Sequence, residues 1–559
     1  MNHLFSVTPS VDIQRSAFDR SSTLKTAFDS SYLVPIYLDE VLPGDTFNLQ
    51  ASLFCRMATP IVPVMDNLYL ETFWFFIPHR LVWNNFTKMM GEQEDPDDSI
   101  DFTVPQTLTG NGSTAKTVVA QSLADYLGCP IGTLYGPNKG VNALPFRSYY
   151  LCYNEFFRDE NLQDSIKINK GDSGVFVPVD VQGNPPFYVG ETRSILKRNK
   201  RFDYFTACLP TPVKFQSMTL PLAGSAPVFG TGKTLGVTNG TDKGGLYQDT
   251  GGDHFLQVSD GNYGISPGAA GDGSTRNKYD GKAIGVISKT QAGDNPENSG
   301  LYADLSAVTA VTVSDLRTAF QIQRLLEAQN RSGTRYVEIL AGQFHVWSGD
   351  ARLQRPEFLG SSSCRINVNP VQQTSSTDAT TPQGNLAAYG VAADRFTGFV
   401  KSFVEHGYIL GLVNVRADLN YQQGLNKLWS RKTRFDFYWP TLAHLSEQAV
   451  LNKEIYLQGT SDDEDVFGYQ ERWAEYRYKP NMITGKMRST YSSPLDIWHL
   501  AQKFDSLPVL NDSFIQENPP VSRVVAVPSE PEFLLDAYFK CKCVRPMPVY
   551  SIPGLIDHF

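Results

Sequence analysis

The chain of 559 residues has a formal net charge of −9, from 49 Lys plus Arg against 58 Asp plus Glu, and only 19% of its residues are charged. Its 41% hydrophobic content can fill a large core, which excludes a disordered chain. A protein that coats nucleic acid unaided usually carries a basic excess or a basic arm, and neither is present here. Contact with nucleic acid must therefore be local or shared with a more basic partner.

The seven cysteines are scattered singly, apart from Cys541 and Cys543, which favours free thiols and a reducing compartment. Residues 1–15 lack the charged and apolar regions of a signal peptide. No apolar run reaches the roughly 18 residues that a membrane-spanning helix needs. We therefore expect a protein made in a cytoplasm, without membrane insertion.

Strand patterns dominate the first quarter of the chain. Apolar side chains alternate with polar ones at Phe47, Leu49, Ala51, Leu53 and Cys55, as in a strand with one buried face. The run 68–77 is apolar on both faces and ends at Pro78, as expected of a fully buried strand. A helix is predicted next over 80–90, because Val82, Phe86 and Met89 then share one face.

Two short motifs resemble catalytic or nucleotide-binding patterns, but each is incomplete. Gly171-Asp172-Ser173-Gly174 resembles the nucleophile segment of trypsin-like proteases, yet no histidine stands in a catalytic context, so a turn is favoured. Gly230-Thr231-Gly232-Lys233-Thr234 resembles the end of a phosphate-binding loop, but Pro227 replaces the required glycine. The sequence thus predicts no catalytic residue, no cofactor and no enzyme.

Acidic and thiol side chains are the candidate metal ligands in this sequence. The acidic runs 92–98 and 462–465 do not have the spacing of an EF-hand, so solvated loops are favoured. Cys541 and Cys543 would share one face of a strand, with His558 as the only nearby additional ligand, so structural thiols are favoured. No metal site is predicted.

The most suggestive chemistry is basic. Five cations without an intervening acid, Arg193, Lys197, Arg198, Lys200 and Arg201, precede the rings of Phe202, Tyr204 and Phe205. A second cluster combines Arg431, Lys432 and Arg434 with Phe435, Phe437, Tyr438 and Trp439. Cations that follow phosphates beside rings that stack bases form a surface for single-stranded nucleic acid. The alternative is a solvated basic patch that flanks core aromatics.

Residues 224–300 differ from the rest, because they hold 18 of the 44 glycines and no tryptophan. Such a segment buries little surface and is too long for an ordinary connection, which favours an exposed excursion that contacts a partner. A second helix is predicted over 314–329 with Ser314 as N-cap, and further strands over 336–347, 397–415 and 533–544. The strands are too dispersed for α/β alternation, so an antiparallel sandwich with large insertions is predicted.

Several stretches resemble the major capsid proteins of microviruses, the gokushovirus branch in particular. The matching blocks are RSAFDRSSTLKTAFDSSYLVPIYLDEVLPGDTF (15–47), FFIPHRLVWNNFTKMMGE (75–92), LKRNKRFDYFTACLPTP (196–212), DARLQRPEFLG (350–360), QQGLNKLWSRKTRFDFYWPTLAHLSEQAVLNKEIY (422–456), ERWAEYRYKPNMITG (471–485) and IPGLIDHF (552–559). These blocks span nearly the whole chain in order, so together they are more specific than any single motif.

The resemblance implies a mainly β fold, an eight-stranded antiparallel jelly roll of viral capsid type with long loop insertions and a few helices. It implies an N-terminal arm and first part of the shell domain over 1–223, a surface insertion over 224–300 that projects at the threefold axes, and the remainder of the shell domain over 301–559. Sixty copies would form a T=1 shell around circular single-stranded DNA.

The resemblance also implies the partners. They are an internal scaffolding protein, a DNA-pilot protein, a small basic DNA-binding protein and a receptor on the host cell surface. The protein would be made and assembled in the cytoplasm of a bacterial host and then reside in the virion. We expect the DNA contacts at Arg193, Lys197, Arg198, Lys200, Arg201 and Tyr204, with Arg431, Lys432 and Arg434 as weaker candidates.

Two other classes were considered. A monomeric carbohydrate-binding or adhesive β-sandwich would be an extracellular protein, and the missing signal peptide and disulfide framework argue against it. A hydrolase on a jelly roll would need a convergent acidic or metal site, and the sequence offers none.

Overall fold

The computed structural model describes residues 14–107, 116–132, 134–135, 140–172, 195–214, 354–374, 384, 386–395 and 398–550, together with short strands between 228 and 303 and a helix over 313–332. Contacts divide the chain into two units. One comprises Met1–Lys214 and Leu326–Phe559, and the other comprises Phe215–Leu325. The first unit contains the main sheet.

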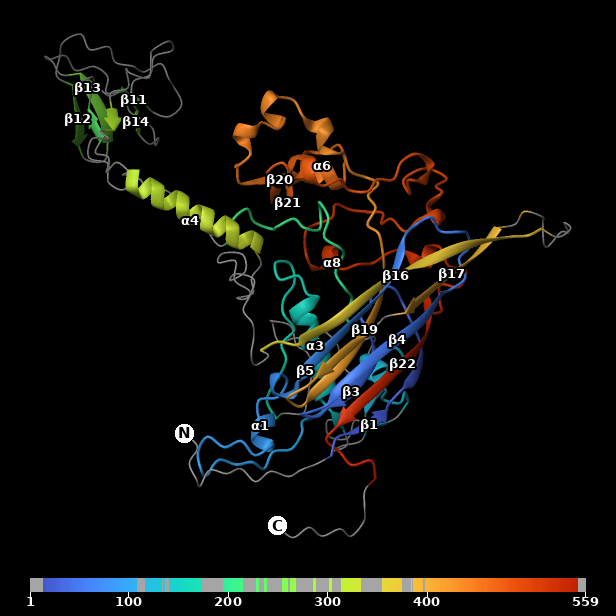
Figure 1. Cartoon of the computed structure of the whole chain (residues 1–559). Coiled ribbons are helices and arrows are strands. Elements are labelled where there is room, and N and C mark those ends of the chain that lie inside the picture. The colour runs from blue at the N-terminus through green and yellow to red at the C-terminus, as the bar shows by residue number, and fades with distance from the viewer. Residues whose placement is uncertain are drawn as a thin grey trace. The chain divides into compact units, whose positions relative to one another are not determined.

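The main sheet is antiparallel and has ten strands (Figure 1). They are β1 (Ser16–Asp19), β2 (Ser22–Phe28), β3 (Val34–Val41), β4 (Thr46–Met57), β5 (Leu68–Pro78), β16 (Glu357–Gln372), β17 (Leu386–Arg395), β18 (Phe399–Ser402), β19 (Gly407–Ala417) and β22 (Phe533–Arg545). The order is β1-β22-β4-β17-β16-β5-β19-β3, while β2 also pairs with β22 and β18 also pairs with β4.

Ten strands occupy eight positions in this sheet. Strands β1 and β2 pair with successive parts of β22, and β17 and β18 pair with successive parts of β4. Each of these pairs therefore acts as one interrupted strand. Strand β16 joins a group of four positions (β1 with β2, β22, β4, and β17 with β18) to a group of three (β5, β19 and β3), because its first part pairs with β5 and its last part with β17. The curled sheet has the character of a jelly-roll sandwich, which confirms the predicted fold class.

The two groups of strands face each other across an aromatic core. Tyr37 on β3 lies 5.1 Å from Phe539 on β22, measured between ring centroids, and Trp74 on β5 lies 6.0 Å from the same ring. Trp74 also lies 6.2 Å from Phe399 on β18. Since β3 and β5 belong to one group and β18 and β22 to the other, these contacts close the sandwich.

The hydrophobic patterns in the sequence have their expected structural meaning. Burial alternates along β4, whose five predicted inward side chains are all buried, and along β22, where Cys541 and Cys543 are buried on one face. Strand β5 is apolar on both faces because it is covered twice. Trp74 faces the sandwich, whereas Phe75 packs against Phe156 of α3 (Leu144–Phe156), with 4.8 Å between the rings.

Two predicted helices differ from the structure. The helix expected over 80–90 is broken into a 3₁₀ turn, His79–Leu81, and a short helix α1 (Phe86–Met89). The break occurs where Trp83 Nε1 and Asn85 Nδ2 donate hydrogen bonds to Asp172, at 2.6 Å and 2.8 Å. The second helix, α4 (Val313–Ser332), begins before Ser314, so this residue lies inside the helix and is not its N-cap.

The strand expected over 397–415 is two strands, β18 and β19, whereas β16 and β17 were not predicted. The strand expected over 336–347 lies outside the described residues. Shorter elements are α2 (Leu123–Tyr126) and the two-stranded pairs β6 (Gln106–Thr107) with β9 (Val141–Asn142) and β7 (Lys116–Thr117) with β8 (Leu134–Tyr135).

The connection between β19 and β22, residues 418–532, helps to build a second, smaller core. It contains β20 (Glu447–Leu451), α6 (Asn452–Ile455), β21 (Val466–Glu471), α7 (Ala474–Arg477) and α8 (Asp512–Ile515). The buried side chains of this core are Tyr204, Phe205, Cys208, Val450, Ile455, Phe467, Ala474 and Phe514. Tyr204 and Phe205, which follow the first basic cluster, thus belong to a packed interior, whereas Phe202 is 76% exposed.

The second unit contains three antiparallel pairs of strands, nested in sequence. The outer pair is β10 (Val228–Gly230) with β15 (Leu301–Ala303), the next is β11 (Gly236–Thr238) with β14 (Gly285–Ile287), and the inner pair is β12 (His254–Ser259) with β13 (Asn262–Pro267). This unit contains the predicted insertion 224–300 and extends past both of its ends.

Candidate nucleic-acid interface

The first basic cluster lies on an extended segment that is held on both sides by backbone hydrogen bonds. On one side, the Leu33 N–H donates to the Leu196 carbonyl at 2.9 Å, and the Arg198 N–H donates to the Ser31 carbonyl at 2.7 Å. On the other side, the Lys200 N–H donates to the Ile515 carbonyl at 2.8 Å. The segment therefore runs between the start of β3 and the end of α8, with its side chains in fixed positions.

Glu71 on β5 gathers three of the chain's arginines. Its side chain is only 7% exposed and pairs with Arg198, with Arg201 Nη2 at 2.7 Å and with Arg416 Nη2 at 3.0 Å. Burial alone would raise the pKa of Glu71, but Arg198 and Arg416 outweigh burial and lower the pKa to about 2. The guanidinium groups of Arg198 and Arg201 thus neutralise a carboxylate inside the chain.

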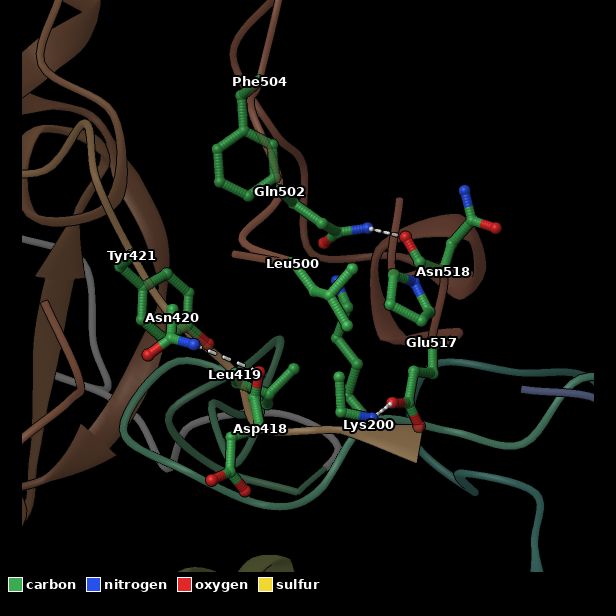
Figure 2. Close-up of a pocket in the computed structure, with 12 residues that line it drawn as sticks. Lys200, Asp418, Leu419, Asn420, Tyr421, Leu500, Gln502, Phe504, Glu517 and Asn518 are labelled. Atoms are coloured by element: carbon green, nitrogen blue, oxygen red, sulfur yellow. Dashed lines mark hydrogen bonds between the residues drawn. The ribbon is translucent and has the colours of Figure 1, made fainter. Parts of the chain in front are cut away.

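Lys200 is buried beside a small cavity of about 20 Å³, the size of one water molecule (Figure 2). Its Nζ donates to the Phe514 carbonyl at 2.6 Å and lies 4.3 Å from the centre of the Phe514 ring. Burial lowers the pKa of Lys200 to about 8. Glu517 lines the same cavity, and its Oε1 accepts the Ala417 N–H at 2.9 Å. Burial raises the pKa of Glu517 to about 7.

Tyr204 is also buried, and its hydroxyl donates to Glu454 Oε2 at 2.8 Å. Both Lys200 and Tyr204 are thus buried in the single chain, and their contact with DNA stays a prediction. Lys197 is half-buried, with its Nζ 2.7 Å from Asn518 Oδ1, and Arg193 lies outside the described residues. For Arg193, Lys197, Arg198 and Arg201, DNA contact stays a prediction.

The second basic cluster lies on the connection from β19 to β22, in a stretch of three 3₁₀ turns, Lys427–Ser430, Arg434–Asp436 and Pro440–Leu442. The Arg431 guanidinium lies 4.4 Å from the ring centre of Tyr476 and 3.7 Å from Glu475. Lys432 and Arg434 are exposed, and the guanidinium of Arg434 lies over Phe435 at 4.7 Å. DNA contact by these three residues also stays a prediction.

Sequence reasoning missed the acidic partners of the first cluster. Glu71, Glu454 and Glu517 stand alone in the sequence, and no spacing links Glu71 to Arg198 and Arg201 or Glu454 to the Tyr204 hydroxyl. Only the folded sheet brings Glu71 beside residues 198 and 201. Glu71 has one sequence signal, since it is a charged residue within a strand that is otherwise apolar on both faces and therefore needs a partner.

Of the two incomplete motifs, the one around Asp172 has a structural role, whereas residues 231–234 of the other lie outside the described residues. Asp172 accepts the bonds from Trp83 and Asn85, while Ser173 lies outside the described residues. The acidic run 462–465 is not wholly a solvated loop. Within it, Asp463 is buried and accepts hydrogen bonds from the backbone N–H groups of Gln458 and Gly459. All seven cysteines are described, and none forms a disulfide.

Two further kinds of site are absent from the described residues. Among them, no group of three or more His, Cys, Asp or Glu side chains is placed to hold a metal ion. None of the helices in this part of the chain combines the length and the apolar character that crossing a bilayer requires.

Comparison with known proteins identifies similar chains over the full length. A family model described as capsid protein (F protein) matches residues 6–555. The chain is 41% identical to capsid protein VP1 of Chlamydia phage 1, covering 99% of this chain and 98% of that protein. It is 43% identical to capsid protein VP1 of Bdellovibrio phage phiMH2K, with 100% and 98% coverage, and 37% identical to that of Spiroplasma virus 4, with 99% and 97% coverage.

Proposed function

The chain belongs to the capsid protein (F protein) family, as a major capsid protein of the gokushovirus type, and from this premise we propose that sixty copies assemble into a T=1 icosahedral shell around circular single-stranded DNA. The observation that carries the proposal is the similarity of the whole chain to three phage capsid proteins. The jelly-roll sandwich supports it as well, because this fold serves in viral shells.

Assembly can be tested directly. The chain, co-produced with the internal scaffolding protein of the same phage, should sediment as a closed sixty-subunit particle in analytical ultracentrifugation. The chain produced alone is the control. Only monomers or open sheets in the presence of the scaffold would contradict the proposal and favour the monomeric, adhesive β-sandwich.

The net charge of the chain supports the proposal that another protein supplies the cations that neutralise the DNA. A shell protein with a net charge of −9 repels a polyanion unless other cations are enclosed with it. We therefore include a small basic DNA-binding protein among the packaged partners, together with a DNA-pilot protein. Assembly takes place in the cytoplasm of the bacterial host, and the finished protein resides in the virion.

The insertion 224–300 is proposed to be a surface excursion between two parts of the shell domain, 1–223 and 301–559, and to bind a receptor on the host cell. The pairing of Val228–Gly230 with Leu301–Ala303 supports this, because it brings the two ends of the segment together. Replacement of residues 231–300 by a short Gly/Ser bridge should leave folding and particle formation intact and abolish attachment. Insoluble protein after this replacement would show that the segment belongs to the core.

DNA contact is proposed for Arg193 and Lys197, because the charges of Arg198 and Arg201 are already opposed by Glu71. The double variant Arg193→Gln, Lys197→Gln should form empty shells normally but give fewer or less stable DNA-filled particles. The matched control is Lys540→Gln, Lys542→Gln, which removes two exposed cations from β22. Equal loss of empty and filled particles would assign the first pair to a subunit interface.

A further inference from the structure

Six exposed aromatic rings gather on the connection between β19 and β22. They are Trp429, Phe435, Phe437, Tyr438, Trp439 and Tyr476, and each is between 47% and 73% exposed in the single chain. We call this set the ring surface. Isolated exposed apolar residues are normal, but a contiguous aromatic patch on a folded protein marks a surface that another molecule covers.

Four rings of the ring surface, Phe437, Tyr438, Trp439 and Tyr476, are held in place within the chain. The Arg431 guanidinium lies 4.4 Å from the ring of Tyr476 and 5.3 Å from that of Phe437, so it joins the two rings. The Tyr438 N–H donates to the Tyr476 hydroxyl at 3.3 Å, and Trp439 Nε1 donates to the Arg434 carbonyl at 2.8 Å. Rings that are fixed before binding lose little conformational entropy on binding, which favours a specific protein contact.

The composition of the surface fits a contact between proteins. Tyr, Trp and Arg are the residue types that dominate the binding energy of interfaces, whereas Lys is depleted there. The ring surface has two tryptophans and two tyrosines, and Arg431 contacts two of its rings. Arg431 already pairs with Glu475, which makes it a positioning group for the rings more than a phosphate ligand.

We propose that the ring surface docks on a second copy of this chain and forms one of the contacts between shell subunits. This rests on the proposed self-assembly and names a surface that carries it. Charge complementarity supports the choice of occupant, because the exposed Lys432 and Arg434 border the rings while the chain as a whole has a net charge of −9. The exposed acidic loop 92–98 is one source of opposite charge on the neighbouring copy.

The test compares a double variant of the ring surface with a single control variant at an exposed ring elsewhere on the chain. Trp429→Glu with Phe435→Glu places two charges on the ring surface, and the matched control Phe54→Glu changes a ring on β4 that is 50% exposed. With the scaffold present, the double variant should lose at least ten-fold in particle yield while its monomer keeps the wild-type melting temperature. The control should assemble normally. If the double variant does not fold, Trp429→Ser alone, which introduces no charge, is measured in the same way.

The possible results separate the proposals. Normal particle yield from the double variant overturns the docking surface. Normal empty shells with fewer DNA-filled particles also overturn it and assign the rings to nucleic acid. If the wild-type chain forms no shells at all, the proposed function fails, and the ring surface is then judged by concentration-dependent self-association in sedimentation. Self-association of the wild type that is lost in the double variant supports the surface, and its persistence in the variant overturns it.

Discussion

The substitution Glu71→Gln tests the buried ionic cluster, because it removes the one carboxylate that Arg198, Arg201 and Arg416 share. The side chain of Glu71 is 7% exposed and that of Arg416 is 10% exposed, so solvent screens the cluster weakly. Gln keeps the size and shape of Glu but removes the charge that faces the three guanidinium groups, of which Arg201 keeps Asp418 at 3.8 Å. The expected result is a large loss of stability.

The magnitude follows from the pKa of Glu71. It falls from 4.5 to about 2, because Arg198 and Arg416 outweigh the opposing effect of burial. At about 1.4 kcal/mol per pH unit, the charged form contributes about 3 kcal/mol to the free energy of unfolding at pH 7. Loss of one partner of a buried ion pair costs about 3–5 kcal/mol in general, which agrees.

The sign of the pH dependence is also fixed. A carboxyl group with a lowered pKa stabilises the folded chain above its unfolded pKa, and this stability is lost as the pH falls through the folded pKa. The difference between wild type and Glu71→Gln should therefore be complete at pH 7, shrink to about 1.4 kcal/mol at pH 3 and about 0.4 kcal/mol at pH 2, and disappear below about pH 1.

The assay is denaturant unfolding of the purified chain at several pH values. The matched control is Asp536→Asn, which removes the carboxylate of the exposed Lys25–Asp536 pair and should cost less than about 1 kcal/mol. A Glu71→Gln chain within about 1 kcal/mol of the wild type at pH 7 would refute the reasoning, as would a difference that does not change between pH 7 and pH 3.

Three further predictions concern other parts of the fold. Glu517→Gln should raise the melting temperature at pH 8, because burial raises the pKa of Glu517 to about 7. The charged form of Glu517 lowers the stability of the folded chain above the unfolded pKa, so the gain should vanish near pH 4.5. Gly398→Ala should give insoluble protein in expression trials, because its Cβ would lie 1.6 Å from the Leu49 carbonyl oxygen at φ +73°. The control Gly459→Ala has open space around it and should lower the free energy of unfolding by only about 1 kcal/mol. Trp74→Ala should lower the free energy of unfolding by about 3–5 kcal/mol in the same denaturant assay, since the fully buried ring contacts both halves of the sandwich.

The strands that were predicted from the sequence are those in which the apolar residues are the buried ones. Alternation in β4 and β22 reflects one buried face, and the continuous apolar run of β5 reflects cover by the sandwich and by α3. Strand β16 was not predicted, because its sequence has no such apolar pattern. Most of its side chains are exposed or half-buried, and Ser361, Ser362 and Ser363 give no hydrophobic period.

Local patterns also failed where a distant residue decides the conformation. The spacing of Val82, Phe86 and Met89 fits a helix, but the chain turns at Trp83 and Asn85 to bind Asp172. No window of the length used for helix prediction contains both sides of that contact. Tertiary contacts thus override a correct reading of periodicity.

The first basic cluster shows why a sequence signal for DNA can be ambiguous. Cations beside rings are typical of a surface that binds single strands, yet the same pairing stabilises a protein interior when a carboxylate lies opposite. Here Glu71 lies opposite Arg198 and Arg201, and Lys200 lies over the ring of Phe514. The deciding residues are more than a hundred positions away in the chain, so composition within the segment cannot distinguish the two roles.

The use of these cations inside the chain has a consequence for the shell. Arg198 and Arg201 are opposed by carboxylates and Lys200 is buried, so the densest cationic run of the chain offers a genome little free charge. The remaining surface belongs to a chain with a net charge of −9. DNA enclosed by the proposed shell would therefore be neutralised mainly by other cations, which is a physical reason to propose a small basic protein among the packaged partners.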